Sequence, residues 1–266
     1  MLMKKNLSSE KILLISYMYP SKKFPHYGVF VKNTEEMLRK NGFDTICVAI
    51  HKQTGSVEKL WAYIWFHVKV FFHVLVKKYA CVYAHYISHT SFALLMIKKL
   101  RPHMRIVVNV HGNDIVPEDE HDRKYLPLVH RVKEKVDFWI APSNYFKEVL
   151  QKEYQIPSDR IVIYPSGGID CGRFVKKDKA KCKEKLFLTS DNFVVGFVGR
   201  IEKNKGWNTL VEALSEIQEK IPQLKCVIVG TGKLEAELEQ LIGDKRLHKL
   251  VIRIPLVSQD KLVDLY

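Results

Sequence analysis

Short apolar segments rich in β-branched residues alternate with longer amphipathic segments along the whole chain. This alternation limits the possible folds, because strands that alternate with helices form parallel sheets with helices on both faces. We therefore expect a doubly wound α/β domain in the N-terminal part. Its strands are expected at residues 11–17, 45–50, 81–84, 106–110, 138–141 and 161–164, and its helices at 30–40, 58–78, 90–100, 124–135 and 144–153, the last capped by Ser143.

A second α/β series follows a charge-dense segment at residues 175–185. Three strands are expected there, about half the number in a six-stranded doubly wound domain. The sequence is therefore predicted to be a fragment of a longer protein, or a chain that a partner completes. The expected strands are 193–198, 225–229 and 249–254, and the expected helices are 207–220, 233–242 and one from Ser258; the predicted organisation is a Rossmann-like domain at 1–175, a charged linker at 176–190 and an incomplete Rossmann-like domain at 191–266.

The composition is that of a basic globular protein. Among 266 residues, 43 are Lys or Arg and 29 are Asp or Glu, which gives a net charge of +14. Such a charge favours phosphates, anionic lipid surfaces or nucleic acid as partners. The lysines are scattered rather than interleaved with aromatic residues in a stripe, so nucleic-acid binding is not expected.

Cysteine usage and the N-terminal residues favour a cytoplasmic location. The five cysteines are odd in number and show no C-x-x-C spacing, which is typical of reduced thiols. Residues 1–10 are polar and do not form a secretory signal.

The segment at residues 60–76 is rich in tryptophan, phenylalanine and aliphatic residues. His67, Lys69 and His73 interrupt it, so we do not expect it to cross a membrane. Two interpretations stay open. The segment forms a mostly buried packing helix, or it also contacts a membrane interface at the inner face of the membrane, where aromatic residues and lysines are favoured.

The run from Val198 to Gly206 places Arg200 and Lys205 directly after an apolar segment. Residues 193–198 are continuously apolar, which predicts a strand buried on both faces of a parallel sheet. The two cations would then lie at the carboxyl edge of the sheet, where open α/β sheets bind ligands. Two fixed cations can neutralise a leaving diphosphate. The alternative is a solvated loop whose charges have no ligand.

Several motifs occur in an order that resembles the family-4 retaining glycosyltransferases, whose GT-B architecture has two Rossmann-like domains. The resemblance covers almost the whole chain. Its motifs are Tyr27-Gly28-Val29-Phe30, His85, His111-Gly112-Asn113-Asp114, Ala141-Pro142-Ser143, residues 164–170, Gly199-Arg200 through Lys205-Gly206, and residues 229–233.

The resemblance implies a donor site for a nucleotide-diphosphate sugar. Arg200 and Lys205 would hold the diphosphate, and a backbone N–H at Gly28 would approach it; the alternative for Gly28 is an ordinary turn glycine. The nucleotide pocket would be lined by Gly199, Gly230 and Gly232 and flanked at the base by Leu256 and Val257.

The resemblance also implies a catalytic centre at His111. This histidine would position the transferred sugar by hydrogen bonding, while the leaving phosphate accepts the proton of the acceptor; the alternative is a satisfied core histidine. Tyr27, His85, Asn113 and Asp114 would lie on the acceptor side.

Cofactor and metal sites are not expected. Position 235 is Glu where a dinucleotide-binding loop beginning at Gly230 would need a third glycine, and no P-loop is present. His85 and His89 lack the intervening glutamate of a zinc motif. The nucleotide sugar would be a substrate, and transfer would not depend on a metal.

The leading hypothesis is therefore transfer of a sugar to a hydroxyl acceptor with retention, in polysaccharide or glycoconjugate synthesis, with a sugar or lipid-linked acceptor. The family carries an E-x7-E segment that is absent from this sequence, so the activity of the 266-residue form stays open. The alternative hypothesis is a non-catalytic module that binds an anionic ligand or needs a partner chain to complete its fold.

Overall fold

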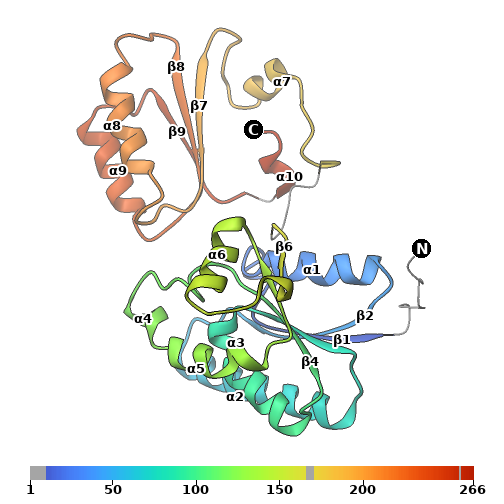
Figure 1. Ribbon diagram of the computed structural model, residues 1–266. Coiled ribbons are helices and arrows are strands. Elements are labelled where there is room, and N and C mark those ends of the chain that lie inside the picture. The colour runs from blue at the N-terminus through green and yellow to red at the C-terminus, as the bar shows by residue number, and fades with distance from the viewer. Residues whose placement is uncertain (1–9, 166–170, 258) are drawn as a thin grey trace. The chain divides into compact units, whose positions relative to one another are not determined.

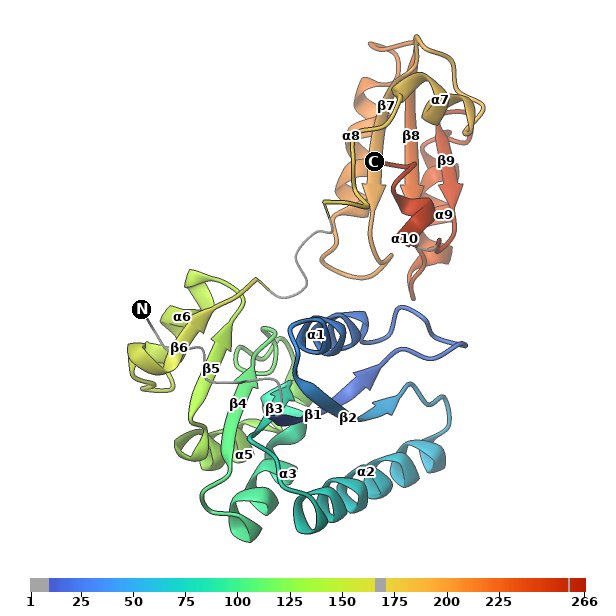
Figure 2. The same cartoon turned by 90° about the vertical axis from the view of Figure 1, so that its right-hand side faces the viewer.

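A computed structural model of the protein describes residues 10–165, 171–257 and 259–266. The chain forms two compact units, Met1–Gly168 and Ile169–Tyr266, which we call unit 1 and unit 2. Figures 1 and 2 show both units.

Unit 1 contains a six-stranded parallel sheet with the order β2-β1-β3-β4-β5-β6. The strand order reverses between β1 and β3, so the carboxyl ends of these two strands form a topological switch point. The expected strands are therefore present and pair in parallel. Their bounds are β1 Lys11–Tyr19, β2 Asp44–His51, β3 Cys81–His85, β4 Arg105–Asn109, β5 Phe138–Ala141 and β6 Ile161–Ile163.

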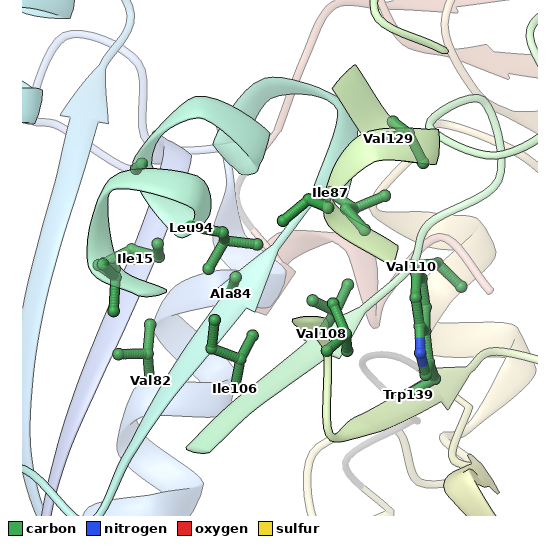
Figure 3. Packing of buried hydrophobic residues seen from close by; sticks show 14 of the residues in the cluster. Ile15, Val82, Ala84, Ile87, Leu94, Ile106, Val108, Val110, Val129 and Trp139 are labelled. Carbon is green, nitrogen blue, oxygen red and sulfur yellow. The ribbon is translucent and has the colours of Figure 1, made fainter. Parts of the chain in front are cut away.

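Helices cover both faces of this sheet because successive strand residues point to opposite sides. Leu13 and Ile15 of β1 face α2, α3 and α5, whereas Ile12 and Leu14 face α1 on the other side. Figure 3 shows residues of the core that lies between the sheet and helices α2, α3 and α5. The helices are α1 Val29–Lys40, α2 Ser56–Val76, α3 Ile87–Leu100, α4 Glu120–Arg123, α5 Leu126–Val132 and α6 Asn144–Lys152, with 3-10 turns η2 at Lys133–Lys135 and η3 at Ser158–Arg160.

The helix expected at 124–135 is divided in the structure. Pro127 lies in the first turn of α5, and residues 133–135 form the separate turn η2. Proline has no backbone N–H and is tolerated in the first turn of a helix rather than in its interior, so α5 begins next to Pro127. Ser143 caps α6 as expected, since its hydroxyl accepts a hydrogen bond from the N–H of Phe146.

Unit 2 contains a three-stranded parallel sheet with the order β7-β8-β9. Helices α8 and α9 pack on one face through Trp207, Leu214 and Leu238, among others. The elements are α7 Lys179–Glu184, β7 Phe193–Val198, α8 Trp207–Ile217, β8 Leu224–Val229, α9 Glu235–Asp244, β9 Val251–Ile254 and α10 Gln259–Leu262.

The segment expected as a charged linker, residues 176–190, belongs to unit 2 in the structure. It forms α7, and Leu188 packs with Val227 and Val229 on the face of the sheet opposite α8 and α9. Lys177 and Lys185 both bind the carboxylate of Asp264 near the end of the chain, the second at 2.6 Å.

The expectation that β7 is buried on both faces is wrong. Phe193 is 55% exposed and Val198 is 36% exposed, and the other residues of β7 are at most half-buried. In the part of the chain that the structure describes, β7 lies at the edge of its sheet, whereas β8 lies in the centre and is almost fully buried.

Candidate functional site

Three expected site residues of unit 1 follow neighbouring strands. His85 ends β3, His111 follows β4 by two residues, and Gly28 precedes α1 after β1. Because β3 pairs in parallel with both β1 and β4, with His85 opposite Asn109, the carboxyl ends of these strands meet at one edge of the sheet. The edge coincides with the switch point, where α/β sheets bind ligands.

His85 and His111 form a direct contact, which we call the histidine pair. The Nδ1 atom of His85 lies 2.9 Å from Nε2 of His111. His85 is fully buried, and its Nε2 has no hydrogen-bonding partner among the described residues. His111 is half-buried, so it is the member of the pair that a ligand can reach.

Aromatic rings hold the imidazole of His111 in place. Tyr86 stacks on it with ring centres 4.6 Å apart and an angle of 18°, and the ring of Phe30 lies 4.6 Å away. Tyr86 has a φ of 60°, an unfavourable conformation for a residue other than glycine. The strand-to-helix junction at Tyr86 is therefore strained in the conformation that stacks its ring on His111.

The histidine pair is uncharged at neutral pH. Burial lowers the pKa of His111 to about 4. Burial, together with the neighbouring His111, lowers the pKa of His85 well below its usual value. A neutral His111 can donate or accept a hydrogen bond, but it contributes no positive charge.

Asp114 organises the backbone beneath the pair. It is 2% exposed, and its carboxylate accepts hydrogen bonds from the backbone N–H groups of His111 and Gly112 at 2.9 Å and of Ile87 at 3.1 Å. Burial raises the pKa of Asp114 to about 6, while these hydrogen bonds oppose the shift. The side chain joins the end of β3 to the loop after β4.

The other residues expected on the acceptor side make local hydrogen bonds within unit 1. Asn113 is half-buried and its amide approaches Asp122 at 3.4 Å. Tyr27 is half-buried and its hydroxyl donates to the carbonyl of Tyr17 at 3.4 Å. Gly28 has a φ of 75°, and a Cβ atom there would lie 2.5 Å from the backbone of Met18, so the close approach of α1 to β1 requires glycine.

The Gly199, Arg200, Gly230 and Gly232 positions come together in unit 2. The N–H of Gly199 donates to the carbonyl of Val229, and the N–H of Ile201 donates to that of Thr231, each at 3.0 Å. A Cβ atom at Gly230, whose φ is 130°, would lie 1.9 Å from the carbonyl oxygen of Gly199. The two loops after β7 and β8 therefore pack backbone against backbone.

The loop at residues 199–206, which we call the cationic loop, presents its charges to solvent. The side chain of Arg200 is 67% exposed and forms an ion pair with Glu202 at 3.1 Å. Lys205 is exposed. The indole N–H of Trp207 donates to the carbonyl of Glu202 at 3.1 Å, which ties the loop to the start of α8. An exposed ion pair contributes little energy, so Arg200 can exchange Glu202 for a phosphate.

The remaining residues expected on the donor side differ in their exposure and contacts. The N–H of Gly232 donates to the carboxylate of Glu235 at 2.8 Å, which puts a negative charge where a dinucleotide-binding loop would hold phosphate. Leu256 is 54% exposed, whereas Val257 packs against the cluster around Leu188. Residues 166–170 of the motif at 164–170 lie outside the described residues.

One group of potential metal ligands occurs among the described residues. Asp119, His121 and Asp122 offer atoms within 4.8 Å of one another at the surface. The two carboxylates already accept backbone hydrogen bonds around α4, Asp119 from the N–H of Asp122 and Asp122 from that of Glu118.

Family models match both units. The model described as Glycosyltransferase Family 4 matches residues 28–173, which is more than half of the chain. The chain belongs to glycosyltransferase family 4. A second model, described as Glycosyl transferases group 1, matches residues 178–266 of this family-4 chain.

Curated relatives carry glycosyltransferase names. The chain is 32% identical over 165 residues to O-antigen chain mannosyltransferase C of Escherichia coli, with 61% of this chain and 41% of that protein covered. It is 28% identical over 173 residues to alpha-monoglucosyldiacylglycerol synthase of Acholeplasma laidlawii, with 64% and 37% covered. The matches thus span about two fifths of the length of these relatives.

Solved structures show the same GT-B fold. Sucrose-phosphate synthase from Thermosynechococcus elongatus has a TM-score of 0.72 at 17% identity, with 97% of this chain and 73% of that chain covered. HepE of Anabaena in complex with UDP and glucose has a TM-score of 0.63 at 19% identity, with 96% and 71% covered.

Sequence reasoning did not identify the contact between His85 and His111 or the aromatic rings around it. One signal for the contact was present in the sequence. Both histidines come at the ends of predicted strands, and the ends of paired parallel strands lie side by side. The stacking of Tyr86 had no signal of its own in the sequence.

Proposed function

We propose that this chain acts in a glycosyltransferase that moves a sugar from a nucleotide-diphosphate donor to a hydroxyl acceptor with retention, in polysaccharide or glycoconjugate synthesis. The observation that carries the proposal is the cationic loop, whose backbone is fixed at the carboxyl edge of β7 and β8 while Arg200 and Lys205 stay exposed. The solved structures of HepE with UDP and with UDP-glucose support a nucleotide-sugar donor.

In this proposal Arg200 and Lys205 neutralise the diphosphate as it leaves. A guanidinium donates two hydrogen bonds to phosphate oxygens, and the lysine adds a compact charge. These two cations supply the electrostatic stabilisation, so the transfer is proposed to be independent of a metal.

His111 has a different role in this proposal. Because its pKa is lowered to about 4, it is neutral and suited to hydrogen-bond a sugar hydroxyl. It does not take up the proton of the acceptor; the departing phosphate does. The contact with His85 and the stack with Tyr86 fix the orientation of the imidazole, which is the property that a positioning residue needs.

We also propose that the protein is located in the cytoplasm. The five cysteines all carry free thiols in the structure, and Cys226 is buried. Free thiols persist in a reducing compartment, where nucleotide sugars would be available as donors.

The test measures donor binding rather than turnover. Titration calorimetry with UDP, GDP and ADP and their sugars is expected to show binding of one nucleotide class. Replacing Arg200 and Lys205 together with alanine is expected to weaken binding by about 3 kcal/mol, because charge-assisted hydrogen bonds contribute about 1.5–3 kcal/mol each.

Lys203→Ala provides the matched control, since Lys203 is an exposed cation of the same loop. It is expected to bind as the unmodified protein does. Equal losses in the Lys203 and Arg200/Lys205 variants would reduce the proposal to general electrostatic attraction. Absence of binding for all three nucleotide classes would contradict it.

A further inference from the structure

Helix α2 is apolar on two opposite sides. One side packs on the sheet of unit 1 through Phe66, Val70 and Val74, which are the buried residues of this 21-residue helix. These positions are four residues apart and form one narrow stripe. The stripe belongs to the core on the side of the sheet away from α1.

The opposite side of α2 is also apolar, although it is exposed. Trp61 is 56% exposed and Phe72 is 58% exposed, and at 100° per residue each lies about 180° from Val70 around the helix. We call the exposed apolar residues of this side the outward face: Val57, Trp61, Ile64, Trp65, Phe72, Leu75 and Val76.

The neighbouring helix extends this surface. Phe92 of α3 is 57% exposed, and its ring lies 5.1 Å from that of His67 on the flank of α2. A contiguous exposed surface with this many large apolar side chains is unusual on a soluble protein and indicates a partner.

The helix lies along the sheet, which excludes an orientation across a bilayer. Among the described residues α2 is the helix whose length and composition would permit a membrane span, with 17% of its apolar window buried. It connects β2 to β3, however, and both strands pair with β1 in one sheet. A spanning α2 would place β2 and β3, which both pair with β1, on opposite sides of the bilayer.

The charges around α2 are almost all positive. Residues 52–78 contain five lysines and one acidic residue, Glu58. The carboxylate of Glu58 accepts a hydrogen bond from the N–H of Gly55 at 3.3 Å and so caps the helix. At the other end, Lys77 and Lys78 are exposed and line an open hollow together with Lys11 and Glu10.

A cation also fixes the carboxyl end of the helix. The guanidinium of Arg101 donates to the carbonyls of Val74 at 3.2 Å and Leu75 at 3.1 Å. The last turn of the outward face is thus held against α3, with Lys77 and Lys78 directly beyond it.

We propose that the outward face of α2 docks on an anionic lipid bilayer, with the helix in the plane of the membrane interface. Tryptophan rings flanked by lysines are favoured at this depth, where the apolar body is buried and the ammonium groups reach lipid phosphates. A second copy of the chain would present the same lysines, whereas an anionic surface complements them. The proposal goes beyond the proposed transfer reaction and does not depend on it.

Intrinsic fluorescence gives a direct test because the chain has four tryptophans. Trp139 and Trp207 are 0% and 6% exposed, so an environmental change on docking is reported by Trp61 and Trp65. With vesicles of phosphatidylglycerol and phosphatidylcholine, we expect a blue shift of the emission and quenching by lipids brominated on the acyl chain. Vesicles of phosphatidylcholine alone are expected to give a much smaller response.

Substitutions on α2 test whether the outward face is the surface that binds the vesicles. Replacing Trp61, Trp65 and Phe72 with serine is expected to reduce co-sedimentation with the anionic vesicles at least about tenfold. The matched control replaces three exposed apolar residues outside α2, Tyr145, Val175 and Phe187, and is expected to sediment as the unmodified protein does. Circular dichroism and the thermal midpoint show whether each variant is folded.

A charge variant tests the headgroup contact. Lys77→Glu with Lys78→Glu is expected to lower vesicle binding about tenfold or more, because each lysine near the surface contributes about 1 kcal/mol. Equal sedimentation of the serine and control variants would overturn the proposal. So would a failure of the unmodified protein to bind anionic vesicles, and a dimer in solution that the serine variant abolishes would assign the outward face to a second copy instead.

Discussion

The histidine pair of unit 1 is enclosed by aromatic rings and carries no charge at neutral pH, whereas the cationic loop of unit 2 is exposed and carries two positive charges beyond its ion pair. In unit 1 side chains hold the functional group: His85, Tyr86 and Phe30 contact His111. In unit 2 the backbone holds it, through hydrogen bonds between the loops after β7 and β8.

Under the proposed function, the two constructions suit two different tasks. A group that orients a neutral hydroxyl needs a fixed direction, which buried aromatic contacts provide. A group that neutralises a diphosphate needs a charge that is available to the ligand, which a rigid backbone with exposed side chains provides. Substitutions should therefore act on packing and acid stability in unit 1, and on backbone geometry and ligand affinity in unit 2.

The largest effect is expected from Gly230→Ala. The new Cβ atom would lie 1.9 Å from the carbonyl oxygen of Gly199 at a φ of 130°. Overpacking together with backbone strain should lower the free energy of unfolding of unit 2 by about 4 kcal/mol. Amide hydrogen exchange of β7 and β8 as a function of urea concentration measures the loss in unit 2.

Gly206→Ala is the control for this prediction. Gly206 has a φ of 79° but nothing within 4 Å of a new Cβ atom, so only the conformational cost of about 1 kcal/mol is expected. Similar losses in both variants would show that the contact between the loops does not determine the stability of unit 2.

Acid should destabilise unit 1 through its histidines. The folded-state pKa of His111, about 4, lies below the usual 6.5, so its contribution is fully present above pH 6.5 and is lost as the pH falls towards 4. His111→Gln should reduce the loss of unfolding free energy across this range by about 3 kcal/mol, at about 1.4 kcal/mol per pKa unit. Urea denaturation at a series of pH values measures it.

Asp114 should act with the opposite sign. Its folded-state pKa of about 6 lies above the usual 3.8, so its contribution is present below pH 3.8 and is lost as the pH rises through 6. Asp114→Asn removes this opposing effect and should make the acid destabilisation steeper. If both variants changed the pH dependence in the same direction, the description of the site would be wrong.

A smaller effect is expected from Trp207→Phe, which tests the attachment of the cationic loop. The substitution removes the hydrogen bond from the indole to the carbonyl of Glu202 and some buried volume. A cost of about 1–2 kcal/mol in unfolding free energy is expected. Trp61→Phe should leave stability unchanged because Trp61 is exposed, and thermal unfolding compares the two.

The smallest effect is expected from Glu202→Gln, which frees Arg200 from its ion pair. Nucleoside diphosphate affinity should rise about twofold to fivefold, since exposed ion pairs contribute about 0.2–1 kcal/mol. Calorimetry measures the change. Glu219→Gln makes the same charge change at an exposed position of unit 2, and an equal gain there would point to net charge rather than to Arg200.

The sequence allowed the strands and most helices to be predicted, because alternating apolar patterns determine them locally. It did not allow the exposure of β7 to be predicted, since an apolar run looks the same in a central and in an edge strand. The burial of Leu188 was also not predicted. This residue lies within the charged segment 176–190, and its burial depends on a tertiary contact with Val227.

The candidate site was predictable in part for the same reason. His85 and His111 could be placed at the carboxyl edge from their positions after strands. The neutral state of the pair depends on burial. The hydrogen bonds of Asp114 come from two N–H groups in the loop after β4 and one at the start of α3, and no local sequence pattern contains this arrangement.

The backbone of Tyr86 has a positive φ, so a substitution there affects thermal stability and the orientation of His111 in different ways. Glycine at this position would relieve about 1–2 kcal/mol of backbone strain, yet it would remove the ring that stacks on His111. The lost packing of the ring, which also contacts Phe30, offsets that relief, so a screen for heat resistance alone would not report the loss of His111 orientation in Tyr86→Gly. Engineering of this chain needs a binding or transfer screen alongside the thermal one.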